Sequence, residues 1–279
     1  MPWFLDFVAA TELARRDSRD AGRTDPVTVY LHAIEEGKTR ALEKIWPGEI
    51  VIEDPRAGTI KDRRKLRQFI RENKARFASL HVTVEIVAST SMGSRAAVEL
   101  LAHLDNKGNV TRWPIAVVVE SPDDESVFFR TYCSQWPVDG RRHIRPPILG
   151  PTEKRPNGVV GRHLAALAAG DIDAIMQTFT RTGFLREPIG PHAFHQGADA
   201  LRSFFSKSFS EGGGIDLECC CITDDGVRCA VEYNLVRWGR HTVPPQAGVA
   251  AFERDPGGLL SAVRIYDDVE APCDSGASA

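Results

Sequence analysis

The sequence predicts an α+β protein built from two copies of one domain. Two acidic residues, Asp54 and Glu187, each follow a short apolar run and precede a proline, and they stand 133 residues apart. The glycines Gly37 and Gly170 recur at the same spacing. In both halves, helical periodicity comes first and an alternating, strand-like pattern follows. Self-similarity at a long fixed offset indicates a duplicated domain, and helices followed by strands favour the α+β class.

Further blocks repeat in the same order. Arg95 and Glu99 return as Arg228 and Glu232, and the triplet from Arg130 to Tyr132 returns as Arg264 to Tyr266. We therefore expect a first domain over 1–136, a proline-rich linker over 137–157, a second domain over 158–270 and a disordered tail over 271–279.

In the first half, a helix is expected over 1–18. Asp25 and Pro26 form a helix start signal and Gly37 a stop signal. A short helix carries Leu42 and Trp46. The remaining predicted elements are a strand over 50–54, a helix over 62–77, and strands near 82–87, 95–104, 111–120 and 126–134.

The second half repeats this order. Gly170 ends a helix over 159–169, and Asp171 caps a helix that carries Ile175 and Phe179. The other predicted elements are a strand over 183–187, a helix over 198–209, and strands near 215–222, 227–238, 242–253 and 259–268.

One face of the predicted helix over 62–77 is strongly basic. The residues are Arg63, Arg64, Lys65, Arg67 and Arg71. Such a run is typical of a solvated helix face, and contact with phosphates is the alternative.

Composition excludes several classes of function. The net charge is −3, which gives no electrostatic case for nucleic acid or an anionic membrane. No window approaches 18 uninterrupted apolar residues, and the first ten residues are interpreted as a helix rather than a signal peptide. The six cysteines form no CxxC pair and are expected to be free thiols, as in a reducing cytoplasm.

Each half resembles the nuclear transport factor 2-like superfamily, with the ketosteroid isomerases and the SnoaL-like polyketide cyclases as the nearest branches. The resemblance is carried by residues 30–37 and 163–171 as the first helix with its glycine break, by 53–55 and 186–188 as the acidic residue before proline, and by 264–268 as the closing strand. It implies two tandem cone-shaped domains, each with helices packed on a curved antiparallel sheet around an apolar pocket. Because members of this superfamily commonly dimerise, the tandem chain is expected to form an internal pseudo-dimer, with a further homodimer as an alternative.

The resemblance also implies catalytic roles. In the isomerase branch, the residue matching Asp54 is the general base and the residue matching Tyr30 donates a hydrogen bond to the developing oxyanion. The matching residues in the second half are Glu187 and His163. That branch has a second oxyanion donor, and here Ala116 and Gly248 align with it, which argues against steroid isomerisation itself.

Water-activating relatives, which open epoxides, use carboxylates with a nearby arginine. Glu99 with Arg130, and Glu232 with Arg264 and Asp268, are the candidates for such groups, although a structural ion pair explains the first pair equally well. Tyr132 and Tyr266 complete the expected substrate pocket, because alternation places Arg264, Tyr266 and Asp268 on one strand face. His192 and His195 lack a third clear ligand, so no metal site is expected.

Three functions follow as hypotheses. The first is a cofactor-independent isomerase or cyclase acting on an apolar, polyketide-like or steroid-like molecule. The second is epoxide hydrolysis or opening, and the third is a non-catalytic role as a small-molecule-binding or interaction protein. The same carboxylates serve all three, so the fold alone does not decide among them.

Overall fold

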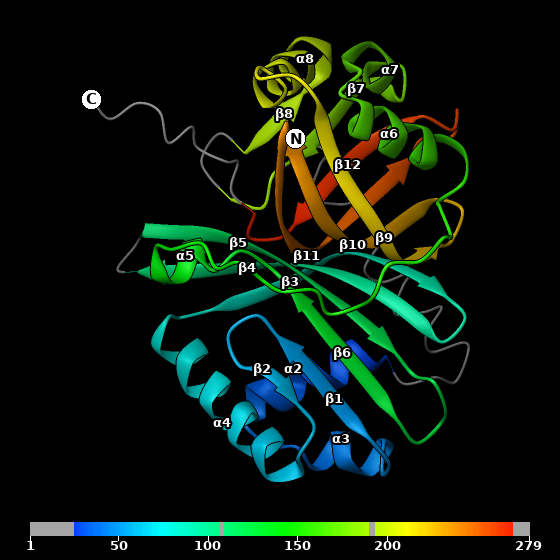
Figure 1. The fold of residues 1–279 in the computed structure, drawn as a ribbon. Helices are drawn as coiled ribbons and strands as arrows, with labels where there is room; N and C mark the ends of the chain where they lie inside the picture. Colours follow the sequence, from blue (N-terminus) through cyan, green and yellow to red (C-terminus); the bar gives the residue numbers. More distant parts are fainter. Residues whose placement is uncertain (1–24, 107–108, 190–192, 270–279) are drawn as a thin grey trace. The chain divides into compact units, whose positions relative to one another are not determined.

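The computed structural model describes residues 25–106, 109–189 and 193–269. The chain divides into two compact units, Met1–Cys133 and Ser134–Ala279, drawn in Figure 1. Each unit contains helices and one six-stranded sheet. The predicted α+β class and the duplication are therefore confirmed, whereas the helix expected over 1–18 and the tail over 271–279 lie outside the described residues.

The first unit begins with the helix that the Asp25 signal predicts. The Asp25 carboxylate accepts hydrogen bonds from the backbone N–H groups of Val27 and Thr28, and Gly37 ends the helix at a φ of 70°. The elements are α2 (Pro26–Glu36), α3 (Arg40–Ile45), β1 (Ile50–Asp54), β2 (Gly58–Ile60), α4 (Arg63–Ser79), β3 (Thr83–Met92), β4 (Arg95–Asn106), β5 (Asn109–Glu120) and β6 (Val127–Tyr132).

The second unit repeats the order of the first after one additional short helix. Its elements are α5 (Trp136–Asp139), α6 (Gly158–Ala169), α7 (Ile172–Met176), β7 (Phe179–Arg186), β8 (Phe194–Gln196), α8 (Gly197–Ser208), β9 (Gly214–Asp224), β10 (Arg228–Gly239), β11 (His241–Arg254) and β12 (Leu260–Tyr266).

The two sheets share one topology. Their strand orders are β2-β1-β6-β5-β4-β3 and β8-β7-β12-β11-β10-β9. Most pairs are antiparallel, but β1 lies parallel to β6 and β7 lies parallel to β12. The sheets are therefore mixed rather than purely antiparallel as predicted, because the first strand of each copy runs parallel to the last one. Hydrophobic alternation along a strand does not reveal which partner it chooses.

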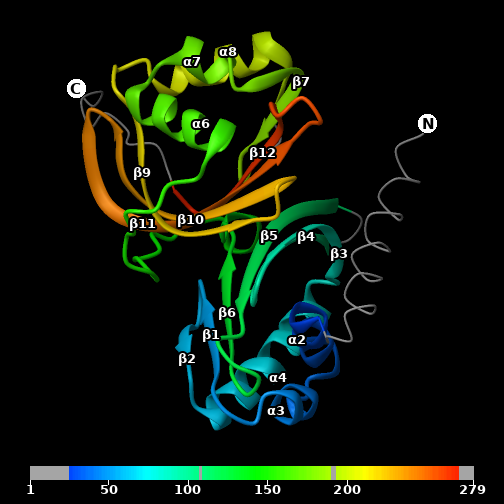
Figure 2. The same cartoon turned by 90° about the vertical axis from the view of Figure 1, so that its right-hand side faces the viewer.

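In each unit the helices pack on one face of a bent sheet. Figure 2 shows β3 to β5 curving around α2 and α4, and β9 to β11 curving beside α6. Register shifts at Ile86/Ala88 and at Leu235/Arg237 mark β-bulges, which bend a strand. The core of the second unit lies between this sheet face and the helices, where Val160, Phe205, Val231 and Phe252 are buried together.

The predicted linker is part of the second unit. Residues 145–152 have no regular secondary structure, yet they hydrogen-bond to three strands. The carbonyls of Arg145 and Leu149 accept bonds from Ala247 N–H and the Asn234 side-chain amide, and Thr152 N–H donates to the Cys219 carbonyl. These bonds fix residues 145–152 to β9, β10 and β11.

Candidate functional site

Strand register places Tyr30 and Asp54 on the helix-facing side of the first sheet. Ile52 of β1 lies beside Phe129 of β6, and the Tyr30 ring stacks on Phe129 with centroids 4.7 Å apart. Because side chains two residues apart share a face, Asp54 points to the same side as Ile52. The sequence-predicted pair is thus brought together.

Tyr30 is buried and held in its protonated form. Burial raises the pKa of its hydroxyl far above the usual value, the negative charge of Asp54 raises it further, and a hydrogen bond with the Thr131 side chain acts in the opposite direction. A tyrosine in this state is a hydrogen-bond donor and not a base. That is the property required of an oxyanion donor.

The Asp54 side chain stabilises the turn at the end of β1. Its Oδ1 accepts hydrogen bonds from the backbone N–H groups of Arg56 and Ala57, at 2.9 and 2.8 Å, which forms the turn into β2. Among the described residues, Asp54 forms no ion pair with an arginine. Its Oδ2 is the oxygen left for other chemistry.

Glu187 occupies the matching position in the second unit, but its surroundings differ. Arg186 lies beside Arg264 as Glu53 lies beside Arg130, so both acids follow equivalent register positions. The Glu187 carboxylate is 2.7 Å from Nε2 of His195, whose ring lies 4.4 Å from that of Phe204. His195 therefore pairs with an acid, and His192 lies outside the described residues.

His163 is enclosed by aromatic side chains and is electrically neutral. Burial lowers the pKa of its imidazole to about 4. The Thr178 hydroxyl donates to the Ile175 carbonyl, so it accepts a hydrogen bond from Nδ1 of His163, 3.0 Å away. In this tautomer Nε2 carries no proton. The geometry therefore gives His163 no N–H for an oxyanion, contrary to the role expected from the resemblance.

A second polar pair in this unit was not predicted. The Tyr233 hydroxyl donates a 2.6 Å hydrogen bond to Oδ2 of Asp267. Burial raises the pKa of the Asp267 carboxyl to about 6, against the lowering effects of Tyr233, the Val269 N–H and Arg142. Tyr233 lies among the buried core residues of the helix-facing side. Its position inside an apolar alternation on β10 gave no sequence signal of a polar partner.

The Tyr233 ring fills the space above Gly248. A Cβ atom on Gly248 would lie 2.6 Å from Cζ and 2.7 Å from Oη of Tyr233, so only glycine fits beneath the ring. From the sequence, a second oxyanion donor was expected to be missing at Gly248, and the Tyr233 hydroxyl lies above this glycine.

The expected pocket residues Glu99, Arg130 and Tyr132 lie on the other face of the first sheet. Glu99 is opposite Ala116, which is opposite Tyr132, and Arg130 is two residues from Tyr132. Neighbouring Phe129, by contrast, packs against Tyr30. This corrects the expectation that one pocket would hold these residues together with Asp54, because a strand alternates its side chains between two faces.

Arg130 also has an acidic partner that the sequence analysis did not single out. Glu120 is 2.6 Å from Arg95 and 3.3 Å from Arg130. The second unit contains the same arrangement, with Glu253 3.4 Å from Arg228 and 3.1 Å from Arg264. We call these two clusters the arginine–glutamate triads. Their presence in both copies indicates a role in the fold.

The residues that were expected to line the pocket of the second unit also lie on the face of the sheet opposite the helices. Glu232, Arg264 and Tyr266 are buried on the face opposite Val231 and Val263, which belong to the core. The Arg186 guanidinium lies over the Tyr266 ring, 4.6 Å from its centroid. These residues, too, are separated from Glu187 by the thickness of the sheet.

Asp268 accepts hydrogen bonds from the segment that follows β6. It lies beyond the end of β12, where Oδ1 accepts a 2.5 Å hydrogen bond from the Ser134 hydroxyl. Oδ2 accepts bonds from the backbone N–H groups of Gln135 and His143, at 3.0 and 2.8 Å. A carboxylate with three donors of its own chain is a structural anchor rather than a reactive group.

The predicted thiol state is confirmed for the cysteines of the described residues. Cys133, Cys219, Cys220, Cys221 and Cys229 are free. In the part of the chain that the structure describes, no cluster of three His, Cys, Asp or Glu residues could hold a metal ion. Within the same ranges, no helix combines the length and apolar character needed to cross a membrane.

Two α+β units of identical topology, each with an acidic residue at the end of its first long strand, define a tandem cone-fold protein. The chain belongs to the SnoaL-like domain family, whose sequence profile matches residues 27–129 and again residues 160–261. The predicted tandem relationship is thus shown. A comparison with curated proteins gave no match.

Solved structures resemble one copy at a time. A protein proposed to be a polyketide cyclase from Sinorhizobium meliloti is 23% identical, with 38% of this chain and 92% of that chain covered and a TM-score of 0.31. The epoxide hydrolase/cyclase-like enzyme SalBIII, described in pyran ring formation in the polyether salinomycin, is 22% identical, with 39% and 86% covered and a TM-score of 0.33. RV0760c from Mycobacterium tuberculosis is 13% identical, with 40% and 94% covered and a TM-score of 0.35.

Proposed function

We propose that the protein is a cofactor-independent acid/base enzyme of the isomerase or cyclase type, acting on an apolar polyketide-like or steroid-like molecule. The observation that carries the proposal is the Tyr233–Asp267 pair. The Asp267 carboxyl is buried and has a pKa of about 6. It accepts a hydrogen bond from Tyr233, whose ring lies above Gly248 on the helix-facing side of the second sheet. An acid whose pKa lies near neutrality exchanges protons efficiently at physiological pH.

Register supports a shared site with Glu187. Arg186 lies beside Arg264, so the next residue, Glu187, is level with Ile265, and Asp267 follows two residues further along the same face. In the proposed reaction, Glu187 removes a proton from the carbon next to a carbonyl. The resulting enolate oxygen accepts a hydrogen bond from protonated Asp267, whose Oδ2 keeps the hydrogen bond that Tyr233 donates. Glu187 then returns the proton to another carbon, which completes an isomerisation without a cofactor.

Tyr30 and Asp54 provide a simpler version of this chemistry in the first copy. The pKa of Tyr30 is raised by burial, so its hydroxyl is protonated, and Asp54 is the matching carboxylate. However, Asp54 already accepts two backbone hydrogen bonds. We therefore assign the main activity to the second copy.

A test that needs no knowledge of the product is carbon-bound hydrogen exchange in D₂O. A panel of apolar ketones, including steroid ketones and aromatic β-diketones, is incubated with the protein, and exchange next to the carbonyl is followed by NMR. Glu187→Gln and Asp267→Asn should abolish most of the exchange. Asp199→Asn, which alters an exposed carboxylate in the first turn of α8, should leave it unchanged. Tight ligand binding without exchange would favour the binding-protein alternative.

The Glu187–His195 pair favours epoxide opening as the second candidate. A carboxylate that orients an imidazole lets the imidazole take a proton from water. The water oxygen then bonds to an epoxide carbon, the carbon–oxygen bond breaks, and the imidazolium returns the proton to the alkoxide. Incorporation of ¹⁸O from labelled water into a diol, lost in His195→Gln, would distinguish this reaction from isomerisation.

A further inference from the structure

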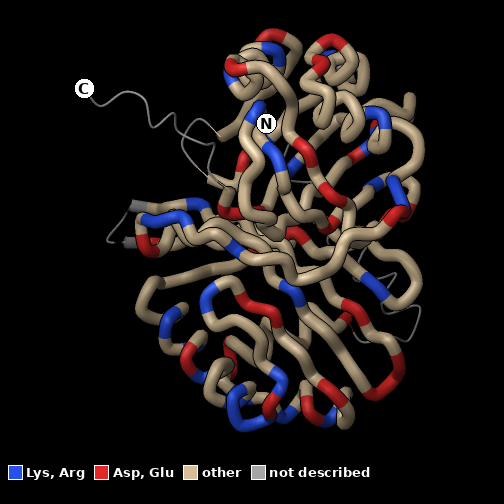
Figure 3. The backbone as a smooth tube through the Cα atoms, viewed as in Figure 1, with Lys and Arg blue, Asp and Glu red and all other residues tan. Residues whose placement is uncertain are grey.

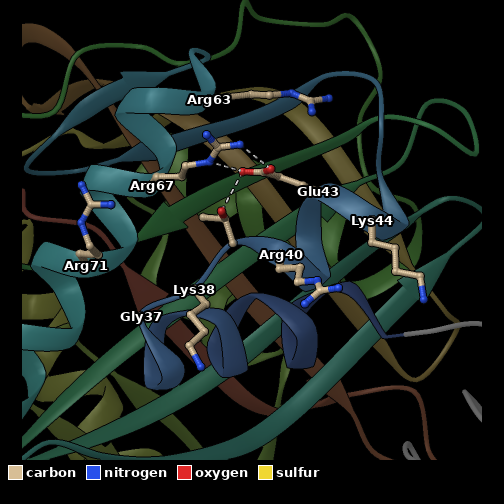
Figure 4. A pocket seen from close by; sticks show the side chains of 9 residues that line it. Gly37, Lys38, Arg40, Glu43, Lys44, Arg63, Arg67 and Arg71 are labelled. Carbon is tan, nitrogen blue, oxygen red and sulfur yellow. Dashed lines mark hydrogen bonds and ion pairs between the residues drawn. The ribbon is translucent and has the colours of Figure 1, made fainter.

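A basic cleft opens on the surface of the first unit, between the end of α2, helix α3 and helix α4 (Figure 4). Its volume is about 510 Å³, within the range of about 300–1,000 Å³ typical of small-molecule sites. Six cationic side chains and one carboxylate line it, and among the described residues no aromatic or large apolar side chain does. The cations are Lys38, Arg40, Lys44, Arg63, Arg67 and Arg71.

Two of the cations are held in place. Arg67 donates two hydrogen bonds to Glu43, at 2.8 and 2.7 Å, and the Thr39 hydroxyl donates to the same carboxylate at 2.7 Å. The Arg67 contact keeps the pKa of Glu43 below its usual range, so Glu43 stays ionised. Arg63 donates to the backbone carbonyls of Pro47 and Gly48. One side of the cleft is therefore fixed before any ligand arrives.

The other four cations, Lys38, Arg40, Lys44 and Arg71, form no hydrogen bond or ion pair through their side chains with any residue in the described ranges. Figure 3 shows how Lys and Arg recur along α4 in a chain whose net charge is −3. Like charges grouped around one hollow repel each other and do not stabilise the fold. Binding of an anion would remove this repulsion.

The second copy of the domain shows that the fold does not need these charges. Gly37 matches Gly170, and buried Leu66 of α4 matches buried Leu201 of α8. On this alignment the residues that replace the six cations are Asp171, Asp173, Gln177, Ala198, Arg202 and Ser206. The one remaining cation, Arg202, forms an ion pair with Asp173 at 2.8 Å.

We infer that this cleft is a binding site for a small polyanion with at least two phosphate groups. Planar guanidinium groups bind phosphate oxygens in pairs, and lysines add point charges. The residues that line the cleft offer charge and hydrogen bonds but no aromatic ring or large apolar side chain, so the phosphates carry the recognition. The cleft contains neither Tyr233 nor Asp267, and the inference is independent of the proposed acid/base activity.

Calorimetric titration of the full chain with inorganic tripolyphosphate, in about 50 mM NaCl, tests the site. We expect a dissociation constant below about 1 mM that rises at least about tenfold in the double variant Arg40→Gln, Arg71→Gln. The matched control is Arg64→Gln, Lys65→Gln, which removes the same charge from exposed positions outside the cleft. It should change the constant by no more than about twofold.

Two kinds of result would overturn the inference. The first is absence of heat with tripolyphosphate, or equal losses in both double variants, which would indicate diffuse attraction by surface charge. The second is binding to phosphatidylserine vesicles or to a single-stranded oligonucleotide that tripolyphosphate does not displace. That result would assign the cations to a macromolecular surface.

Discussion

The Tyr233 hydroxyl donates a hydrogen bond of 2.6 Å to the Asp267 carboxylate inside the second unit. The described part of the first unit has no such pair at the matching positions. Those positions hold Leu100 and Cys133, both buried. The two copies share a topology but differ where polar groups enter the helix-facing side. This difference underlies the assignment of the main activity to the second copy.

The raised pKa of Asp267 links folding to pH. The pKa of this carboxyl is 3.8 in the unfolded chain, and burial raises it to about 6 in the folded protein. The protonated carboxyl therefore stabilises the fold fully below pH 3.8, and this contribution is lost as pH rises through about 6. Asp267→Asn lacks this dependence. Between about pH 4 and pH 7, wild type should therefore lose on the order of 3 kcal/mol of unfolding free energy relative to the variant. Urea unfolding at both pH values measures the difference, and parallel pH curves for the two proteins would contradict it.

The rate of hydrogen exchange should depend on the protonation state of the same carboxyl group, that of Asp267. If protonated Asp267 donates to the enolate oxygen, the exchange rate should fall as pH rises through about 6. In Asp267→Asn, the side-chain amide donates at every pH, so the slower residual rate should lack this decline. Rate measurements from about pH 4.5 to 8 check the prediction. A decline that persists in the variant would assign the titration to another group.

The arginine–glutamate triads should support the fold. Burial tends to raise the pKa of Glu120, but Arg95 and Arg130 outweigh it and hold the pKa below the usual range. Glu120→Gln should cost about 1–3 kcal/mol, because Arg130 is almost fully buried and loses a charged partner. This cost should shrink as pH falls below 4.5, where the unfolded carboxyl is protonated.

Glu253→Gln should show a similar effect, since Arg264 is its buried partner in the second triad. Glu125→Gln, at an exposed loop position, serves as the control. Thermal unfolding of the three variants measures the costs. If Glu120→Gln were as stable as Glu125→Gln, the triad would be a surface contact without energetic weight.

Local sequence signals predicted most of the fold. Asp25 and Gly37 marked the bounds of α2 because capping depends on residues a few positions apart. Three-residue strands such as β2 and β8 were missed, since such segments show no periodicity. Phe179 was placed in a helix but begins β7, because its apolar side chain fits the core from either element.

The candidate site was less predictable because it depends on contacts distant in sequence. Tyr30 and Asp54 were paired through the resemblance, whereas Tyr233 and Asp267 meet only through the register of β10, β11 and β12. Alternation placed Arg264 and Tyr266 on one face of β12, but it did not show which face the helices cover. That choice is made by tertiary packing.

Asp268 should be essential for the order of the segment after β6. Asp268→Ala leaves Ser134 and two backbone N–H groups without their acceptor, at a cost of about 1–3 kcal/mol for each buried donor. We expect a lower melting temperature and faster protease cleavage at Arg141 and Arg142. Asp225→Ala, in the turn between β9 and β10, is the control, since it also removes a side-chain acceptor of two backbone N–H groups but in a different turn. Equal cleavage at these arginines in both variants would rule out a specific anchor.

Replacement of the two matching acids should affect activity very unequally. Both Asp54→Asn and Glu187→Gln keep the side-chain shape, and the amide introduced by Asp54→Asn retains an oxygen for the N–H groups of the turn into β2. Neither change should reduce stability greatly. Removal of a positioned general base costs about 10²–10⁴ in rate, so Glu187→Gln should lower the exchange rate by that factor. Asp54→Asn should lower it less than about threefold, because the first copy contributes little turnover. The initial exchange rate on the best ketone measures both effects. A large loss in Asp54→Asn with a small loss in Glu187→Gln would move the activity to the first copy, and small losses in both would leave ligand binding as the better explanation.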